Sequence, residues 1–506
     1  MAERQGLWLV ALAGLYLVLV IAMGSGRSYF GYHETDYVLF FVPDAKRFLA
    51  GQPLQSPFHP PLYPMLIAAA YASVGDWLAA ALIVAMVAGL AALLSSYLLL
   101  LHLGGRPAAW GAVLTLLGSG TFMEESARAS SDALFLALFV GSCLLAIRAG
   151  ATGSRRLWWL CGTAIGLELM TRSNAPPLVL LAAVPFVAAI PLRAKVADCL
   201  CLLGGAAVPV VAMLLYGAMT GSTVFPSSNH LSLATSFFHV GEDHSSLDTA
   251  IEAAERFESM TEVLAYDPAW LARMYFVRLY ELLASDITSV IEPLLYFMFL
   301  PGAFFLIGRR WNRAFMIIMV VLIAETLLVN LKPFHPRYYL FLVPFLGAAI
   351  GYACREIIRA DWPPPVRTGF TAALVLMFAV ATAQATAKPY RYARNQMTEL
   401  AEIVPLARHQ IGPGAAVVAR KPHLAFHTEA TAVFLPQLQT LGELREFLRL
   451  LAADSPAYLL YGQAERRWRP QYRSLATSDL APNWLEVVAD SDEPGRWVLY
   501  RYRDPD

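Results

Sequence analysis

The chain has 506 residues, 57% of them hydrophobic and 15% charged, and its formal net charge is zero. Together with a mean hydropathy of +0.51, this composition excludes an ordinary soluble globular protein. The zero net charge provides no overall basic field, so we expect no nucleic-acid partner.

Apolar runs separated by short polar stretches fill most of the first 387 residues. Since a helix needs about 20 apolar residues to cross a bilayer, we expect a mainly α-helical, polytopic membrane protein with about eleven transmembrane helices. These are expected near residues 6–23, 77–103, 107–122, 132–148, 157–171, 176–192, 196–219, 286–308, 313–331, 338–354 and 368–387. The run 62–74 is too short to span, which favours a re-entrant or juxtamembrane segment.

Basic residues indicate which loops face the cytoplasm, where short loops are enriched in lysine and arginine. With a cytoplasmic N-terminus, four successive inner loops carry such residues. The outer side then receives the loops 24–76, 123–131 and 220–285 and everything after residue 388. In the long third loop, residues 247–271 show a helical, glutamate-rich pattern, which fits either a lid over the membrane domain or a solvated acidic loop.

The composition changes after residue 387 to that of a soluble domain. We therefore expect a membrane domain over 1–387 and a small extramembrane α/β domain over 388–506. Its strands are expected at 415–419, 457–461, 484–488 and 496–500. Thr440 and Glu443 have the spacing of a capping box, which predicts a helix that begins there.

The first outer loop holds the residues that we weigh first. Between residues 37 and 49 apolar side chains recur at helical spacing, with Pro43 as a break and Gly51 as a stop, which predicts an interfacial amphipathic helix. Asp36 stands at its start. Asp44 lies three residues before Arg47 and is expected to pair with it locally. Charges kept near hydrocarbon suggest function, although a solvated loop would carry them at no cost.

Polar side chains from distant parts of the chain gather on the predicted outer face. They are Asp36 and His59 from the first loop, Glu124, Glu125, Arg128 and Asp132 from the second, Arg172 and Asn174 after the fifth span, and Lys332, His335, Arg337, Tyr338 and Tyr339 from the sequence KPFHPRYY. Three of them, Arg172, Lys332 and Arg337, are cations on the side that the positive-inside bias leaves poor in them. One such cation is explained as a membrane anchor, but three at helix mouths indicate a site for an anionic headgroup.

A carboxylate beside phosphate-binding cations suggests transfer of a group from a lipid phosphate. The carboxylate could take the proton of an incoming hydroxyl, and the cations would stabilise the departing phosphate. One base without a covalent intermediate gives inversion. Alternatively, two outer-loop carboxylates share a divalent metal, Mg²⁺ or Mn²⁺, with the phosphate. The sequence establishes no cofactor and leaves both alternatives open.

The order of these motifs resembles the GT-C superfamily of polytopic glycosyltransferases. A long first span, an early aspartate, then FHPPLYP, SARASSDALFLAL and KPFHPRYYLFLVP are similar to its branch of protein O-mannosyltransferases, lipid A aminoarabinose transferases and lipopolysaccharide core galacturonosyl transferases. The resemblance covers roughly residues 6–350. It implies a polyprenyl-phosphate sugar as donor and a hydroxyl-bearing glycan, lipid or protein as acceptor, at the periplasmic face of the bacterial inner membrane.

The resemblance also implies roles for single residues. Asp36 matches the first-loop aspartate held to be the catalytic base or a metal-site residue, and Asp132, with Glu124 or Glu125 as alternatives, matches the second-loop acidic residue. Arg337, with Tyr338, matches an Arg-Tyr pair that contacts phosphate. His59 stands where the aminoarabinose transferases have a lysine, and Tyr37 follows Asp36 where some members have a second acidic residue. These two departures weaken the transfer of a phosphate-binding role to His59 and of metal dependence to the chain.

The alternative function from another class is a transporter or flippase for a lipid-linked or anionic solute, which would use the same polar residues as a binding pocket. Transporters often contain internal repeats, and we find none in the sequence. A long outer loop and a soluble outer domain favour the transferase. A catalytically inactive scaffold of the same fold is the third alternative.

Overall fold

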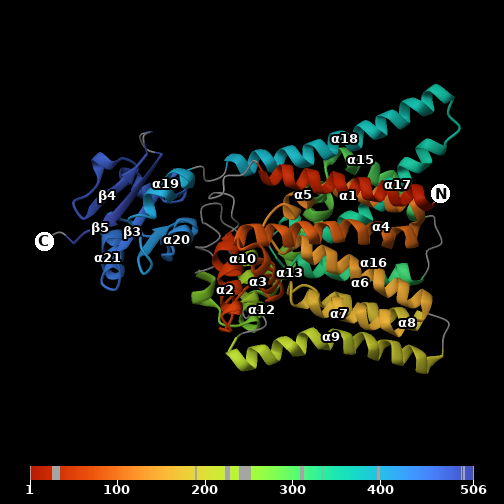
Figure 1. Ribbon diagram of the computed structural model, residues 1–506, viewed down its shortest axis with the longest axis horizontal. Helices are drawn as coiled ribbons and strands as arrows, with labels where there is room; N and C mark the ends of the chain where they lie inside the picture. The colour runs from red at the N-terminus through yellow and green to blue at the C-terminus, as the bar shows by residue number, and fades with distance from the viewer. Residues whose placement is uncertain are drawn as a thin grey trace. The chain divides into compact units, whose positions relative to one another are not determined.

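The computed structural model describes residues 2–25, 35–187, 191–222, 228–238, 252–307, 313–332, 334–395, 399–491, 493 and 496–504. The chain divides into two compact units. Unit 1 comprises residues 1–25, 40–237 and 259–390, and unit 2 comprises residues 26–39, 238–258 and 391–506. Figure 1 shows the helices of unit 1 and the sheet of unit 2.

The first half of the chain is helical, with η marking 3₁₀ or π turns. Its segments are α1 (Ala2–Ser25), η1 (Tyr37–Phe41), α2 (Val42–Leu49), α3 (Leu62–Val74), α4 (Trp77–Leu117), α5 (Gly120–Ser126), α6 (Asp132–Thr152), α7 (Arg155–Leu169), η2 (Pro176–Ala183), α8 (Val184–Val187), α9 (Leu192–Thr220) and α10 (Asn229–Phe238). The predicted interfacial helix is thus formed by η1 and α2, with Pro43 in the first turn of α2, where a missing N–H is tolerated.

Further helices complete unit 1. They are α12 (Met260–Tyr266), α13 (Pro268–Glu281), η3 (Leu282–Asp286), α14 (Ile287–Val290), α15 (Pro293–Ile307), α16 (Arg313–Val329), η4 (Pro336–Leu342), α17 (Val343–Arg359) and most of α18 (Pro364–Asn395). The helical pattern expected over 247–271 lies partly outside the described residues, and its described part contains α12 and the start of α13. The lid interpretation of this loop stays a prediction.

Six described helical segments are long and apolar enough to cross a membrane: α1, α4, α6, α9, η4 with α17, and α18. The expected number of eleven spans is therefore not confirmed. Two of the predicted spans, 77–103 and 107–122, correspond to the single element α4, which is interrupted at Gly105 by a non-helical backbone (φ 75°, ψ −169°). Glycine adopts this conformation without strain.

Close helix packing builds the core of unit 1. Helix α4 packs against α6 and α17, and α7 packs between α6 and α9. At the crossing of α4 and α17, a Cβ atom on Gly111 would collide with backbone atoms of Gly347 and Gly351. Small residues permit this close approach, which is typical of helix pairs in membranes.

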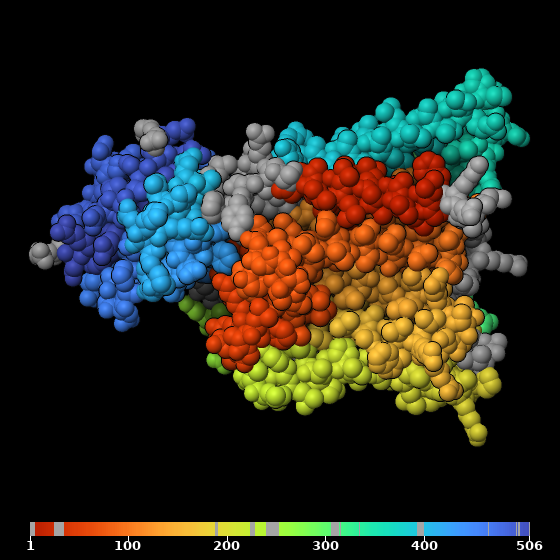
Figure 2. Space-filling model, in the orientation of Figure 1, coloured from red at the N-terminus to blue at the C-terminus, as the bar shows by residue number. Residues whose placement is uncertain are grey.

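Large apolar side chains on the outside of unit 1 face away from this core. Trp8 on α1, Leu215 on α9 and Phe304 on α15 are 61%, 59% and 75% exposed. Figure 2 shows α9 and α18 along two borders of the helical unit in this view. An apolar exterior of this kind suits a hydrocarbon environment rather than water.

Unit 2 contains a five-stranded sheet with the strand order β2-β1-β3-β5-β4. Its elements are α19 (Glu399–Ala407), β1 (Ala416–Ala419), α20 (His423–Thr428), β2 (Thr431–Phe434), α21 (Leu441–Ala452), β3 (Ala457–Gly462), α22 (Gln463–Trp468), η5 (Pro470–Ala476), η6 (Ser478–Leu480), β4 (Leu485–Asp490) and β5 (Trp497–Tyr502). β1 pairs in parallel with β2 and β3, while β5 pairs antiparallel with β3 and β4.

Alternate residues of the strands feed two cores on opposite faces of this sheet. Val418, Leu459 and Tyr500 pack with α21 and η5 on one face, and Val417 and Leu499 pack with α19 and α20 on the other. Four strands correspond to the predicted ones, and β2 is an additional strand that the sequence did not predict. The predicted fold class, a mainly helical polytopic chain with a small C-terminal α/β region, is confirmed.

The expected helix cap in this unit is formed in part. The Thr440 hydroxyl accepts a hydrogen bond from the Glu443 backbone N–H at 3.2 Å, as in a capping box. The Glu443 carboxylate accepts from the Gln439 N–H at 2.8 Å, one residue before the position that a full capping box uses. Both contacts satisfy backbone N–H donors at the start of α21.

Candidate active site

Three cations from two distant parts of unit 1 surround the ring of Tyr338. The charged groups of Arg172, Lys332 and Arg337 lie 5.3, 5.8 and 5.3 Å from the centre of that ring. We call these three residues and Tyr338 the cation cluster. An aromatic face attracts cations, so Tyr338 offsets part of the repulsion between three like charges. The positive charge that remains attracts an anion.

Arg172 is held on its other side by Asp132. Its guanidinium donates a hydrogen bond to the Asp132 carboxylate, and the two side chains are only 12% and 2% exposed. Asp132 begins α6, and Arg172 follows α7. This buried ion pair therefore ties two helix ends together. It favours a role for Asp132 in orienting the Arg172 guanidinium.

Lys332 lies where the chain leaves α16. Its ammonium group lies 3.4 Å from the Ser173 hydroxyl, to which it donates. Burial lowers the pKa of Lys332 to about 8, and the neighbouring charges of Arg172 and Arg337 act in the same direction. The cost of burying this ammonium is reduced by any anion that binds beside it. A phosphate bound beside Lys332 would therefore stabilise its charged form.

The backbone around Arg337 is fixed by His335. The His335 ring nitrogen Nδ1 accepts from the Arg337 backbone N–H at 3.4 Å, at the start of η4. Pro336 occupies the first position of that helical turn, where its fixed φ angle suits the helix. The sequence HPRY thus fixes the backbone from which the side chains of Arg337 and Tyr338 extend.

The carboxylates of the second outer loop bind within that loop. Arg128 lies 3.3 Å from a Glu124 oxygen and 3.7 Å from a Glu125 oxygen. Glu125 is 1% exposed and accepts a hydrogen bond from the Ser130 hydroxyl. These contacts shape the turn from α5 to α6, directly before Asp132. They support a positioning role for Glu124 and Glu125.

His59 lies in the segment between α2 and α3. Its ring packs on those of Phe40 and Phe41, with centroid distances of 5.3 and 4.9 Å. Three residues later, the Leu62 N–H donates to the Met170 carbonyl at 2.9 Å. The segment that carries His59 is therefore hydrogen-bonded to the chain at Met170, two residues before Arg172, within the same unit.

Asp44 stabilises the backbone of this segment. Its carboxylate is 4% exposed and accepts from the backbone N–H groups of Gln55 and Ser56 at 2.8 and 3.1 Å. The expected local pairing with Arg47 is only part of the picture, because Arg47 attracts Asp44 while donating to the Pro53 carbonyl at 3.4 Å. Two backbone donors make Asp44 a structural residue.

Asp36, the predicted base, belongs to unit 2. It is half-buried and lies one residue before η1. The next side chain, Tyr37, is 1% exposed and packs edge-on against Phe426 of α20 at a centroid distance of 5.9 Å. The segment around Asp36 is thus anchored on the sheet unit. The action of Asp36 at the cation cluster, in unit 1, stays a prediction.

Two buried carboxylates that the sequence analysis overlooked lie in unit 1. Glu325 on α16 is fully buried and accepts a hydrogen bond from the Asn174 amide. Glu168 on α7 is also fully buried, and among the described residues neither of its carboxylate oxygens has a hydrogen-bond partner. The signal was present in the sequence, because each is a charged residue inside an apolar run, where ionisable side chains are rare and functional by default.

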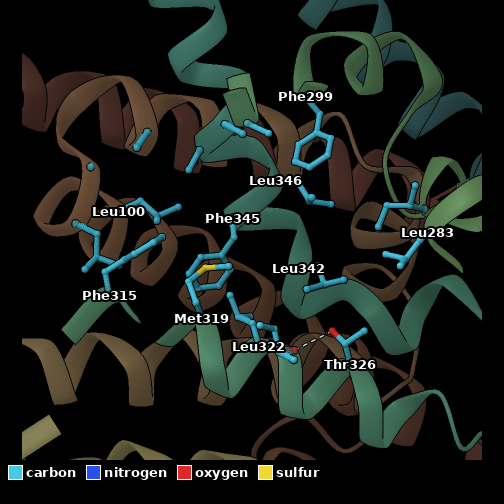
Figure 3. A pocket seen from close by; sticks show the side chains of 18 of the residues that line it. Leu100, Leu283, Phe299, Phe315, Met319, Leu322, Thr326, Leu342, Phe345 and Leu346 are labelled. Carbon is cyan, nitrogen blue, oxygen red and sulfur yellow. Dashed lines mark hydrogen bonds between the residues drawn. The ribbon is translucent and has the colours of Figure 1, made fainter. Parts of the chain in front are cut away.

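An apolar cavity of about 620 Å³ lies between the helices of unit 1. Figure 3 shows aliphatic and aromatic side chains around it, including Leu100 of α4, Phe299 of α15, Met319 of α16 and Phe345 of α17. The Thr326 hydroxyl in its wall donates to the Leu322 carbonyl at 2.8 Å. The cavity is therefore suited to a hydrocarbon ligand.

Two elements of the cavity wall, α16 and η4, also lead to or carry members of the cation cluster. Thr326 follows Glu325 on α16, which leads to Lys332, and Leu342 lies one helical turn after Tyr338 on η4. An amphiphile with an anionic head and a long apolar tail would find partners for both parts here.

The described residues contain no group of three or more histidine, cysteine, aspartate or glutamate side chains that could hold a metal ion. The nearby carboxylates are engaged with cations, as Asp132 with Arg172 and Glu124 with Arg128. These residues do not fit a metal site made of protein ligands alone.

Comparisons with known proteins agree with this geometry. Residues 58–216 match the family described as dolichyl-phosphate-mannose-protein mannosyltransferase. ArnT from Cupriavidus metallidurans bound to undecaprenyl phosphate has the same fold, with a TM-score of 0.58 and 15% identity over 98% of both chains. The chain therefore has the fold of ArnT, and about a third of it matches the mannosyltransferase family.

Other solved structures are also similar in fold. The oligosaccharyltransferase of Archaeoglobus fulgidus in the apo form matches with a TM-score of 0.58 and 11% identity, over 92% of this chain and 72% of that one. The AglB enzyme of the same organism, in complex with an inhibitory peptide and a dolichol-phosphate, matches with a TM-score of 0.55 and 12% identity, over 93% and 71%. No curated protein sequence matches significantly.

The six apolar helices and the shared fold indicate a multi-pass membrane protein. The residues matched by the mannosyltransferase family run from the end of the His59 segment into α9. They include Asp132 and Arg172, and so the buried ion pair lies within the matched region.

Proposed function

We propose that this protein transfers a sugar from a polyprenyl-phosphate donor to the hydroxyl group of a glycan, lipid or protein. The observation that carries the proposal is the cation cluster, of which Lys332, Arg337 and Tyr338 follow or belong to elements that also line the apolar cavity. A polyprenyl-phosphate sugar has the two chemical parts that this arrangement fits. The complexes of ArnT with undecaprenyl phosphate and of AglB with a dolichol-phosphate, on the same fold, support the donor class.

In this mechanism the cation cluster binds the phosphate that links the lipid to the sugar. Arg172 and Arg337 can each donate two hydrogen bonds from a planar fork, and Lys332 adds a compact charge. The charge on the phosphate increases as the bond to the sugar breaks. Cations that are fixed in place before the reaction stabilise that charge without rearrangement.

The hydroxyl of the acceptor attacks the anomeric carbon of the sugar from the side opposite the phosphate. A new carbon–oxygen bond forms as the bond between the anomeric carbon and the phosphate oxygen breaks, and the polyprenyl phosphate leaves with the electron pair. Asp36 takes the proton of the hydroxyl as general base. A single displacement of this kind inverts the configuration at the anomeric carbon.

The apolar cavity takes the part of the polyprenyl tail nearest to the phosphate. Its volume of about 620 Å³ falls in the range of pockets that bury small ligands, roughly 300–1,000 Å³. The rest of a long tail would extend into the bilayer. The site is proposed to face the periplasm at the bacterial inner membrane, because the basic loops favour the opposite side for the cytoplasm.

The test uses the purified protein in detergent with undecaprenyl-phosphate sugars and a panel of lipid A, glycan and peptide acceptors. We expect a sugar-modified acceptor and an equal amount of undecaprenyl phosphate, both detected by mass spectrometry. A product with retained configuration would contradict the single displacement. Solute flux into proteoliposomes without any transfer would replace the enzyme by a transporter.

A further inference from the structure

Glu325 is a fully buried carboxylate in the apolar helix α16. It lies outside the groups that the proposed reaction uses. An ionisable side chain in such a helix is costly and needs partners. Its contacts lead directly to the cation cluster.

The first contact is a hydrogen bond across the unit. The Asn174 amide donates to a Glu325 oxygen, and Asn174 itself is 2% exposed. Asn174 stands in the short turn between α7 and η2, two residues after Arg172. The bond fastens this turn to α16, so Arg172 is held from one side by Asp132 and from the other by the fixed turn.

The second contact is electrostatic. Glu325 attracts both the Arg172 guanidinium and the Lys332 ammonium. Lys332 follows the end of α16 by three residues and donates to Ser173, in the same turn as Asn174. The carboxylate thus attracts two of the three cations and opposes their mutual repulsion.

We propose that Glu325 is a positioning residue for the phosphate site: through Asn174 it fixes the turn that carries Arg172, and through its charge it holds Lys332 beside it. This inference deepens the proposed function and rests on it for the identity of the anion. Glu325 touches no reacting atom in this account. It acts through the residues that bind the phosphate.

The charges around Lys332 make this role measurable. Apart from burial, the charged groups that face Lys332 are Arg172 and Arg337, which lower its pKa, and Glu325 and Asp132, which raise it. Neutralising Glu325 removes one of the two attractive charges, so the pKa of Lys332 falls further below its ordinary value. A purely structural role of Glu325 would not produce such a shift.

The direct experiment is pH-dependent acetylation of the lysines in the full-length purified protein, followed by mass spectrometry. The chain contains five lysines, Lys46, Lys195, Lys332, Lys388 and Lys421, and the other four serve as internal references. Because only the neutral amine reacts, the labelling rate reports the protonation of Lys332. This readout needs neither donor nor transfer, so it stays informative even if the proposed function is wrong.

We expect Glu325→Gln to label Lys332 faster than wild type at pH 7; a fall of half a pKa unit from about 8 raises the neutral fraction, and so the labelling rate, about 2.5-fold. The matched control is Glu168→Gln, which changes an equally buried glutamate that is not among the groups facing Lys332. In the control, labelling should stay as in wild type or become slower. Equal labelling in wild type and in Glu325→Gln would overturn the inference.

A second variant covers the case in which Glu325→Gln does not fold. Asn174→Ala keeps the Glu325 charge and removes the hydrogen bond. We expect its affinity for undecaprenyl phosphate, measured by native mass spectrometry, to fall several-fold with Lys332 labelling little changed. If wild type binds undecaprenyl phosphate and Asn174→Ala binds it equally well, the positioning role is refuted while the proposed function stands. If wild type itself fails to bind the lipid, the proposed function is refuted.

Discussion

The buried ion pair between Asp132 and Arg172 permits a test that separates folding from chemistry. Arg172→Gln leaves the Asp132 carboxylate, 2% exposed, without its partner. Breaking a buried pair in this way costs about 3–5 kcal/mol of unfolding free energy. The double variant Asp132→Asn/Arg172→Gln removes both charges and should recover most of the lost stability. Thermal unfolding in detergent measures both effects.

Transfer activity should not follow stability in this series. If Arg172 binds the departing phosphate, its loss lowers kcat by about 10²–10³, as for other groups that stabilise a developing anion. The stable double variant should therefore stay as inactive as Arg172→Gln. The control Asp132→Asn, which keeps the guanidinium, should lose less activity than either. A double variant with wild-type transfer would refute the assignment of Arg172 to the phosphate.

Three further perturbations test other parts of the account. Asp36→Asn should lower kcat by about 10²–10⁴, the usual share of a general base, with donor binding unchanged by native mass spectrometry; full activity would exclude Asp36 as the base. Burial lowers the pKa of Lys332 in the ligand-free protein to about 8. The affinity of wild type for undecaprenyl phosphate should therefore fall as pH rises from 7 to 9, by at most about tenfold per pH unit above the pKa, whereas the affinity of Lys332→Arg should change little over this range. Equal pH dependence in both proteins would contradict the role of the ammonium. Ala303→Phe fills part of the apolar cavity and should raise KM for a long-chain donor more than for a short-chain one, unlike Ala373→Phe on the exposed side of α18; equal effects on both donors would argue against the cavity as the tail site.

The sequence predicted the membrane fold well because apolar run length is a direct physical signal. The number of spans is not confirmed, since α15 and α16 are short, but the kink at Gly105 divides α4 where the sequence predicted two separate spans. The sequence missed β2, a short edge strand that begins two residues after Glu429, whose backbone has a positive φ of 57°. Four residues carry too little periodicity to indicate a strand.

Part of the site could also be predicted from the sequence. Arg172, Lys332 and Arg337 were grouped because all three lie at helix mouths on one side of the membrane, and the structure brings them to one aromatic ring. The bond between Asn174 and Glu325 could not be foreseen, since it joins residues 151 positions apart. Such pairings depend on which helices pack together, and a single sequence does not contain that information.

The roles of the outer carboxylates were harder to assign from residue type alone. The family resemblance favoured Asp132 over Glu124 and Glu125, and the structure pairs the two glutamates with Arg128 and Asp132 with Arg172. A carboxylate's partner decides whether it orients a cation or remains available as a base. That partner becomes visible only in the folded chain.

The central claim is that the cation cluster holds the phosphate of a polyprenyl lipid. The most direct measurement compares the affinities of the purified protein for undecaprenyl phosphate and for undecaprenol, which has the same tail without the phosphate. We predict that the phosphate form binds at least about 100-fold more tightly, a difference of roughly 2.7 kcal/mol, and that Arg337→Gln removes much of this preference. Equal affinity for the two lipids would contradict the account.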